Sequence, residues 1–308
     1  MTDTFAIAAI QMQTPAWDGD RAVEVIEEVV RNHATAHPWV DMYVMPELVL
    51  SGVVHFGDVT PEQLRAAAQL VPGPRIERMQ ALAERVGCWI VPGSIWETGE
   101  DGVRYNATVA IAPSGEIVAK YRKMYPWLPY EVGTGAGDQY CVFDVPDVGR
   151  FGLTICYDTW FPEVSRMLAW MGAEVILRPT LTPTSDREVE LVMSRANAAF
   201  NQCYFVDVNA VGPWGGGRSA IFDPNGRVLQ EQGATPMVLT ETLDLALVRR
   251  VRRDGTLGLS QTWKQLRDTN APTPMYDDLA GGEIYTSIGE LELPRSRRAT
   301  PGGERSDA

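Results

Sequence analysis

Three segments of the sequence place a chemically useful polar residue directly after a run that is typical of a buried strand. Glu47 follows such a run in "YVMPELVLSG", Lys123 and Glu131 follow another in "AKYRKMYPWLPYE", and Cys156 ends "GLTIC". Polar groups at the ends of buried strands converge on one rim of a sheet, where α/β proteins commonly place their sites. We therefore expect these four side chains to lie close together.

The four residue types complement one another in acyl transfer. The Cys156 thiol is mostly protonated at neutral pH and needs a base or a cation to become a thiolate. A partly buried Glu47, its pKa raised by desolvation, could take and return that proton. Lys123 and the backbone N–H after Cys156 could stabilise an oxyanion, while Glu131 orients the lysine and holds the substrate nitrogen. The implied reaction is acyl transfer to the thiol followed by hydrolysis.

Each residue also has an ordinary interpretation. A glutamate after a strand is most often on the surface, a lysine in "KYRK" is usually solvated, and an isolated cysteine is usually a small buried hydrophobe. The other cysteines, Cys88, Cys141 and Cys203, form no C-x-x-C pair, which disfavours a metal site and a thiol-redox role. A Cys–His hydrolase that uses His55, one of three histidines, is an alternative.

Composition restricts the class of partner. The net charge of −13 disfavours nucleic acid and anionic membranes, because phosphate binding needs clustered cations. The longest apolar runs are too short to cross a membrane, and the N-terminus "MTDTFAIAAIQMQ" lacks a basic segment and a cleavage site. We expect a cytoplasmic protein, in which disulfides are disfavoured.

Strand-like runs alternate with amphipathic helical stretches and are interrupted by hairpins, which predicts an α/β fold with mixed sheets. Helical periodicity occurs at 22–30, 75–86 and 164–171, and a turn is expected at 113–115. The predicted strands are 4–12, 40–47, 87–97, 104–123, 151–158, 173–180, 203–212 and 218–229.

A further helix is predicted after a capping box formed by Ser185 and Glu188. Its apolar positions form one stripe that we expect to face the core: Val189, Val192, Met193, Ala196 and Phe200. The pattern fades from about residue 260. We therefore predict one domain over 1–260 and a C-terminal extension over 261–308 whose end, "PRSRRATPGGERSDA", is disordered or lies on a partner.

The set "MPELVLSG", "KYRKMYPW…E", "GLTICYDTWFPE" and "GRSAIFDPNG", over roughly 5–250, resembles the nitrilase superfamily of carbon–nitrogen hydrolases. The resemblance implies a Glu–Lys–Cys triad at Glu47, Lys123 and Cys156, with Glu131 as the additional active-site glutamate. It also implies a four-layer α-β-β-α sandwich with two mixed sheets and no metal or organic cofactor. Relatives form homodimers or higher homo-oligomers by stacking two sandwiches, and their C-terminal extensions often wrap a partner subunit.

Within the superfamily the chain resembles the aliphatic amidase and formamidase branch. Nitrilases usually carry a Cys-Trp-Glu type sequence where this chain reads "CYDTWFPE". N-carbamoyl hydrolases often carry a basic residue where Thr159 and Trp160 stand. Trp127, Tyr157 and Trp160 would line an apolar acyl pocket, although ordinary core packing would explain them equally well.

The resemblance thus implies an amidase that converts a small neutral amide to the carboxylic acid and ammonia through a cysteine thioester. An N-carbamoyl amino acid or ureidopropionate-type amidohydrolase is the nearest alternative. A nitrilase and a non-catalytic member of the fold are further alternatives.

Overall fold

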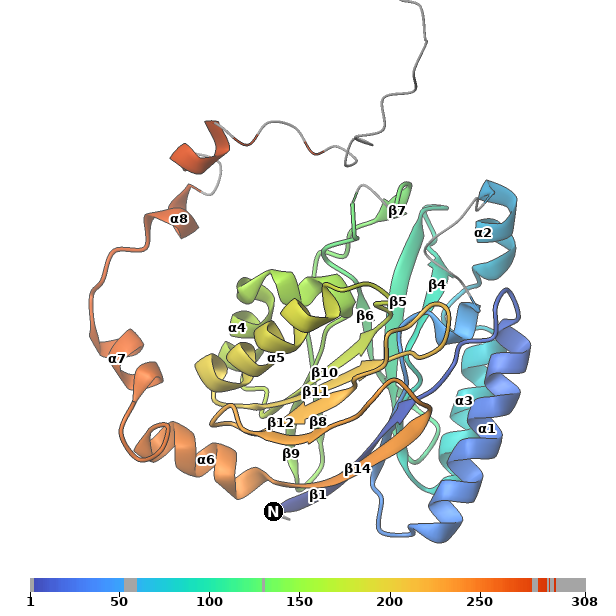
Figure 1. Ribbon diagram of the computed structural model, residues 1–308, viewed down its shortest axis with the longest axis horizontal. Coiled ribbons are helices and arrows are strands. Elements are labelled where there is room, and N and C mark those ends of the chain that lie inside the picture. The colour runs from blue at the N-terminus through green and yellow to red at the C-terminus, as the bar shows by residue number, and fades with distance from the viewer. Residues whose placement is uncertain are drawn as a thin grey trace, which may run out of the picture.

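Two mixed β-sheets form the centre of the protein in the computed structural model, which describes residues 3–52, 60–128, 131–278, 282–286, 288 and 291 (Figure 1). The first sheet has the order β14-β1-β2-β3-β5-β4, with β6 and β7 also paired to β5. Its strands are β1 (Thr4–Gln11), β2 (Met42–Val44), β3 (Trp89–Val91), β4 (Ser94–Thr98), β5 (Arg104–Ile111), β6 (Ile117–Arg122), β7 (Thr134–Gly135) and β14 (Met237–Asp244).

The second sheet has the order β13-β12-β11-β10-β9-β8. Its strands β9, β10 and β11 run parallel to one another, and the outer strands are antiparallel to their neighbours. The strands are β8 (Cys141–Val145), β9 (Gly149–Leu153), β10 (Val175–Thr180), β11 (Tyr204–Asn209), β12 (Ala220–Phe222) and β13 (Val228–Glu231).

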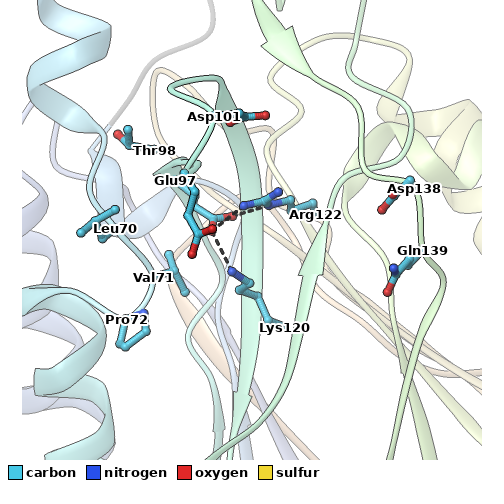
Figure 2. Close-up of a pocket in the computed structure, with 11 residues that line it drawn as sticks. Leu70, Val71, Pro72, Glu97, Thr98, Asp101, Lys120, Arg122, Asp138 and Gln139 are labelled. Carbon is cyan, nitrogen blue, oxygen red and sulfur yellow. Dashed lines mark hydrogen bonds and ion pairs between the residues drawn. The ribbon is translucent and has the colours of Figure 1, made fainter.

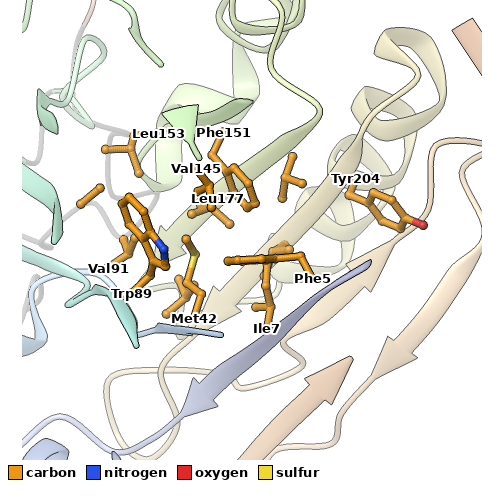
Figure 3. Packing of buried hydrophobic residues seen from close by; sticks show 14 of the residues in the cluster. Phe5, Ile7, Met42, Trp89, Val91, Val145, Phe151, Leu153, Leu177 and Tyr204 are labelled. Atoms are coloured by element: carbon orange, nitrogen blue, oxygen red, sulfur yellow. The ribbon is translucent and has the colours of Figure 1, made fainter. Parts of the chain in front are cut away.

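The side-chain alternation of the strands explains the layers. Along β1, Phe5 and Ile7 belong to the core between the sheets, whereas Ala8 and Ile10 pack against helices on the outer face. Figure 3 shows Phe5, Ile7 and Met42 from the first sheet close to aromatic and aliphatic side chains of the second. This shared apolar core holds the two sheets face to face.

Helices cover the outer face of each sheet (Figure 1). α1 (Gly19–Ala36) and α3 (Pro74–Val86) pack on the first sheet, and α4 (Pro162–Trp170) and α5 (Arg187–Asn201) pack on the second. The α/β sandwich with two mixed sheets and flanking helices predicted from the sequence is confirmed. The other helices within the described residues are η1 (Val49–Ser51), α2 (Pro61–Ala67), η2 (Cys156–Trp160), α6 (Leu245–Asp254), α7 (Thr262–Asp268), α8 (Pro274–Asp277) and η4 (Glu283–Thr286).

The start of α5 differs from the sequence prediction. The helix begins at Arg187, and its N-cap residue Asp186 makes no side-chain capping bond, so the capping box predicted at Ser185 and Glu188 is wrong. The two residues are joined instead by a backbone hydrogen bond, from the Glu188 N–H to the Ser185 carbonyl, in the turn before the helix.

The face that α5 buries is also different. Val189, Val192 and Phe200 are exposed, and Met193 and Ala196 are only partly buried. The buried face is mostly polar and consists of Arg187, Glu190, Leu191, Ser194, Asn197, Ala198 and Asn201. The physical reason lies in the sheet below, where Arg178 and Asp207 present buried charges that only polar side chains can pair.

After β14 the chain continues as α6, which packs against the shared core, and then curves away from the sheets along α7 and α8 (Figure 1). α6 buries Leu245, Val248 and Val251, whereas α7 and α8 bury no residue. The domain boundary at residue 260 stays a prediction, and the final stretch 294–308 lies outside the described residues. None of the helices in the described ranges is long and apolar enough to span a bilayer.

Candidate active site

Glu47 lies just beyond β2, near the middle of the first sheet, and its side chain is fully buried. The Glu47 N–H donates to the Thr180 carbonyl at the end of β10, so this backbone connects the two sheets (3.2 Å). The next residue, Leu48, has a left-handed φ of 51°, and its N–H donates to Ser94 Oγ (2.8 Å). The turn after β2 is therefore held from both sides.

Lys123 follows β6 and lies between two carboxylates. Its Nζ is 2.9 Å from Glu47 Oε1 and 2.9 Å from Glu131 Oε2, and all three side chains are almost completely buried. The Lys123 N–H donates to the Asn106 carbonyl, and the Lys123 carbonyl accepts from the Gly137 N–H. The Glu131 carboxylate also accepts from the Trp127 N–H, which fixes the loop after Lys123.

Cys156 follows β9 in the second sheet and begins η2 with a φ of 45°. This left-handed backbone is uncommon for a residue other than glycine and often marks a functional site. The Asp158 carboxylate stabilises the turn, because its Oδ2 accepts from the Ile155 N–H (2.8 Å) and the Tyr121 hydroxyl (2.7 Å). Its Oδ1 accepts from the Tyr125 N–H (2.9 Å), which ties the Cys156 turn to the Lys123 loop.

Burial and the charges around the thiol keep it protonated. Burial and the negative charge of Glu47 raise the pKa of Cys156, and the opposing effect of the Lys123 ammonium does not cancel them. Burial works against the charged form of Lys123, but the carboxylates of Glu131 and Glu47 hold its pKa well above the usual value. Burial likewise raises the pKa of Asp158 to about 6. The resting site is thus a neutral thiol beside a charged Glu–Lys–Glu cluster.

Asn106 is a site residue that the sequence reasoning missed. It lies on β5, is fully buried, and its Nδ2 is 2.8 Å from Glu47 Oε1 and 3.4 Å from Glu131 Oε1. A single amide therefore contacts both acids that hold Lys123. The available signal was a polar residue within the otherwise apolar strand "RYNATVAI", where an amide needs a specific partner.

A small pocket opens at the thiol. Its volume is only about 20 Å³, little more than one water molecule needs. Trp127, Tyr157 and Trp160, the three aromatic residues expected at an acyl pocket, all line it. The other lining residues are Lys123, Cys156, Leu181, Thr182, Pro183, Thr184, Asp186 and Glu190.

The structure thus brings together Glu47, Lys123, Glu131 and Cys156, and their catalytic roles stay predictions. His55, on which the Cys–His alternative depends, lies outside the described residues. Within the described ranges, no group of three or more His, Cys, Asp or Glu side chains could hold a metal ion.

A larger surface pocket of about 600 Å³ lies elsewhere, between the segment 70–72 and strands β4 and β6 (Figure 2). Its buried acid, Glu97, pairs with Lys120 and Arg122 at 2.8 Å each. The positive charges beside it outweigh the effect of burial and lower the pKa of Glu97. Its lining residues in the described part of the chain include no cysteine, and its buried acid is already paired, so we place the candidate active site at Cys156.

Comparison with known proteins agrees with the geometry. The family model described as carbon-nitrogen hydrolase matches residues 6–253, which is most of the chain. The chain belongs to the carbon–nitrogen hydrolase family. This family model confirms the carbon–nitrogen hydrolase expected from the sequence, and solved structures of the nitrilase superfamily share the fold of this chain.

Two groups of similar proteins are informative. A formamidase from Bacillus cereus (strain B4264) is 29% identical over 212 residues, a match that spans 68% of this chain and only 63% of the formamidase. The structure of Nit3 from Saccharomyces cerevisiae, in branch 10 of the nitrilase superfamily, has a TM-score of 0.73 and 21% sequence identity to this chain. The alignment covers 82% of this chain and 94% of the Nit3 chain.

An amidase from Nesterenkonia sp. AN1 is a further structural neighbour. One of its mutants, 25% identical to this chain, has a TM-score of 0.66, and the alignment covers 81% of this chain and 94% of the amidase. That structure shows covalent addition of the acetamide moiety of fluoroacetamide at the active-site cysteine of the amidase.

The charge arrangement predicts how thiol reactivity responds to Glu47→Gln. Because the Glu47 charge raises the pKa of Cys156, its removal should shift the pH profile of iodoacetamide alkylation to lower pH. At pH 7 to 8 the variant should therefore be alkylated faster than wild type, with Cys156→Ala identifying the labelled residue by mass spectrometry. Glu97→Gln, which removes a buried charge from the pocket of Figure 2, is the control and should leave the profile unchanged. A profile that stays in place or moves to higher pH for Glu47→Gln would contradict this electrostatic account.

Proposed function

We propose that this protein hydrolyses the carbon–nitrogen bond of a small neutral amide to the carboxylic acid and ammonia. The observation that carries the proposal is the Lys123 ammonium held at 2.9 Å by both Glu47 and Glu131 beside the buried Cys156 thiol. This arrangement offers a base, an electrophilic charge and a nucleophile at one small pocket.

The first half-reaction forms a thioester. Glu47 takes the thiol proton as the Cys156 sulfur attacks the amide carbonyl carbon. The carbonyl oxygen becomes an oxyanion, stabilised by the Lys123 ammonium and the Tyr157 backbone N–H, which as part of the first turn of η2 has no partner within that turn. The carbon–nitrogen bond then breaks, Glu47 returns the proton to the leaving nitrogen, and ammonia departs.

The second half-reaction releases the acid. A water molecule enters where ammonia left, Glu47 takes one of its protons, and the resulting hydroxide attacks the thioester carbonyl carbon. Collapse of the second tetrahedral intermediate breaks the carbon–sulfur bond, and Glu47 returns the proton to the Cys156 sulfur. Glu131 keeps the lysine in place through both steps and holds the substrate nitrogen. Positioned acid–base catalysis of this kind contributes about 10²- to 10⁴-fold.

The pocket supports a small neutral substrate. Its charged lining residues in the described part of the chain are Lys123, Asp186 and Glu190, and the lysine is already paired with two carboxylates. An N-carbamoyl amino acid would bring its own carboxylate next to two acids without a cation to receive it, at a cost in affinity. The similarity to a formamidase and an amidase supports the same conclusion.

The direct test measures ammonia release from formamide, acetamide, propionamide, butyramide, benzamide and N-carbamoyl-glycine. Wild type should release ammonia from the short amides, and Cys156→Ala should release none above background. Intact-protein mass after rapid quenching should show an acyl adduct on wild type only. Equal ammonia release by the two proteins would refute Cys156 as the nucleophile, and a wild type that forms no adduct and releases no ammonia would be a non-catalytic member of the fold.

Pocket size predicts the order of preference among these amides. Because the free volume is about 20 Å³, kcat/KM should fall as the acyl chain lengthens from formamide to butyramide. Trp160→Ala should enlarge the pocket and raise the butyramide-to-formamide ratio of kcat/KM by about tenfold. This is the discrimination in kcat/KM that an apolar pocket shows for one or two methylene groups. Trp39→Ala, which truncates an exposed tryptophan after α1, should leave the ratio as in wild type. An unchanged ratio for Trp160→Ala would show that Trp160 does not limit the acyl group.

We also propose that the protein forms a homo-oligomer through the outer face of α4 and α5, as stacked sandwiches would. The exposed side chains Trp170, Val189, Val192 and Phe200 lie on these two adjacent helices. An apolar surface of this kind favours burial against a partner, and a two-fold axis would pair the face with itself.

The oligomer proposal predicts the effect of a charge on this face. Val192→Glu should reduce the mass measured by light scattering to that of the 34.0 kDa monomer, because a carboxylate buried in an apolar interface loses its hydration. Leu257→Glu, another exposed apolar residue but outside this face, should leave the mass unchanged. A wild-type protein that is monomeric at micromolar concentration would exclude the proposal.

A further inference from the structure

A buried cluster of four charged side chains lies directly behind the nucleophile. Arg178 on β10 and Asp207 on β11 face one another in the parallel register of the second sheet. Strand alternation points both toward α5, since Ile176 and Phe205 on the same faces pack against the helices. α5 brings Arg187 and Glu190 to meet them, and all four side chains are almost completely buried.

Arg178 connects this cluster to Cys156. Its Nε donates to the Cys156 carbonyl oxygen at 3.0 Å. Its Nη1 donates to Asp207 Oδ2 at 2.8 Å, and its Nη2 forms an ion pair with Glu190 Oε1 at 3.0 Å. The guanidinium is therefore held by two carboxylates in the one orientation that aims its Nε at the backbone of the nucleophile.

The Cys156 backbone needs such a contact. With a φ of 45°, the residue adopts a left-handed conformation that L-residues avoid unless their surroundings enforce it. The direction of the Cys156 carbonyl fixes the peptide plane that follows, and with it the Tyr157 N–H that serves the oxyanion. A rigid donor on that carbonyl thus orients the thiol and the N–H together.

A second arm of the cluster reaches the thiol itself. Glu190 Oε1 accepts from Thr182 Oγ1 at 3.1 Å, and Thr182 Oγ1 lies 3.9 Å from Cys156 Sγ. Thr182 is fixed in turn by Asn209, whose Oδ1 accepts from the Thr182 N–H and whose Nδ2 donates to the Thr182 carbonyl. The cluster therefore contacts Cys156 at both its carbonyl and its sulfur.

Stability alone does not explain these charges. Apolar side chains of similar size often stabilise a core as well as a buried ion pair does. The chain instead turns the apolar side chains Val189 and Val192 of α5 outward and buries its polar face over Arg178 and Asp207. Two arginines and two carboxylates balance in charge, so the cluster supplies a directed donor to Cys156 without adding a net charge.

We propose that Arg178, oriented by Asp207 and Glu190, is a positioning residue that holds Cys156 in its reactive conformation, with Thr182 fixing the thiol. The effect on turnover rests on the proposed amide hydrolysis, whereas the effect on thiol reactivity does not. Arg178 acts through Cys156 and does not touch the substrate.

Arg178→Lys and Arg187→Lys form a matched pair for the test. Each keeps the charge in the same cluster, but only Arg178 contacts Cys156; Arg187 binds Asp207, Glu190 and the carbonyls of Gly217 and Arg218. A lysine at 178 lacks the Nε donor and the planar fork, so it cannot reach the Cys156 carbonyl and both acids at once. Thermal unfolding of both variants measures the purely structural effect.

Arg178→Lys should lower kcat about 100-fold with KM nearly unchanged, the usual cost of a misplaced reacting group. It should also move the pH midpoint of Cys156 alkylation down by about one unit, as the thiol loses the fixed position in which burial and the Glu47 carboxylate raise its pKa. Arg187→Lys should change kcat less than about threefold and leave the midpoint in place. The proposal would be overturned if both variants changed kcat and the alkylation midpoint to the same extent and in proportion to their losses of thermal stability.

Alkylation separates this inference from the proposed function. If wild type hydrolyses no amide, the proposed function fails, while the alkylation midpoints of the two lysine variants still decide the role of Arg178. Should Arg178→Lys not fold, Thr182→Val, which removes only the hydroxyl between Glu190 and the sulfur, tests the second arm. It should lower kcat about tenfold and shift the alkylation midpoint, and wild-type values for both would overturn the proposal.

Discussion

The ammonium of Lys123, buried between the carboxylates of Glu47 and Glu131, is the interaction on which the rest of the site depends. A charge removed from water is tolerated only where opposite charges and hydrogen bonds surround it. The end of β2, the strand β5 with its Asn106, and the loop after β6 must therefore all converge on one point. Burial and the negative charge of Glu47 together raise the pKa of the nearby Cys156 thiol and keep it protonated.

The proposed nucleophile, Cys156, comes from the other sheet, so the candidate active site lies where the two sheets meet. Asp158 joins the Cys156 turn to the loop that carries Lys123, and the Glu47 backbone bonds to the end of β10. Arg178 reaches the same turn from the opposite side, through the layer between the second sheet and α5. Cys156 is thus held by contacts from both faces of its own sheet, which a strained backbone conformation requires.

α5 shows where reasoning from the sequence fails and why. Its apolar stripe was expected to face the core, since apolar periodicity usually marks the buried face of a helix. Here the sheet beneath the helix carries Arg178 and Asp207, and the need to pair buried charges outweighs the gain from burying Val192 or Phe200. Asn106 was missed for a related reason, because the sequence does not reveal that its strand lies opposite Glu47 and Glu131.

The sequence by itself determined the α/β class, the alternation of strands and helices, and the four residues whose chemistry is complementary. These follow from local periodicity and from motifs, each readable within about twenty residues. Only the tertiary structure decided which face α5 buries, how Asn106 links the two acids, and that Arg178 holds the Cys156 carbonyl. Those features depend on contacts between residues 12 to 59 positions apart that lie on different elements, where the pairing of buried polar groups outweighs local preference.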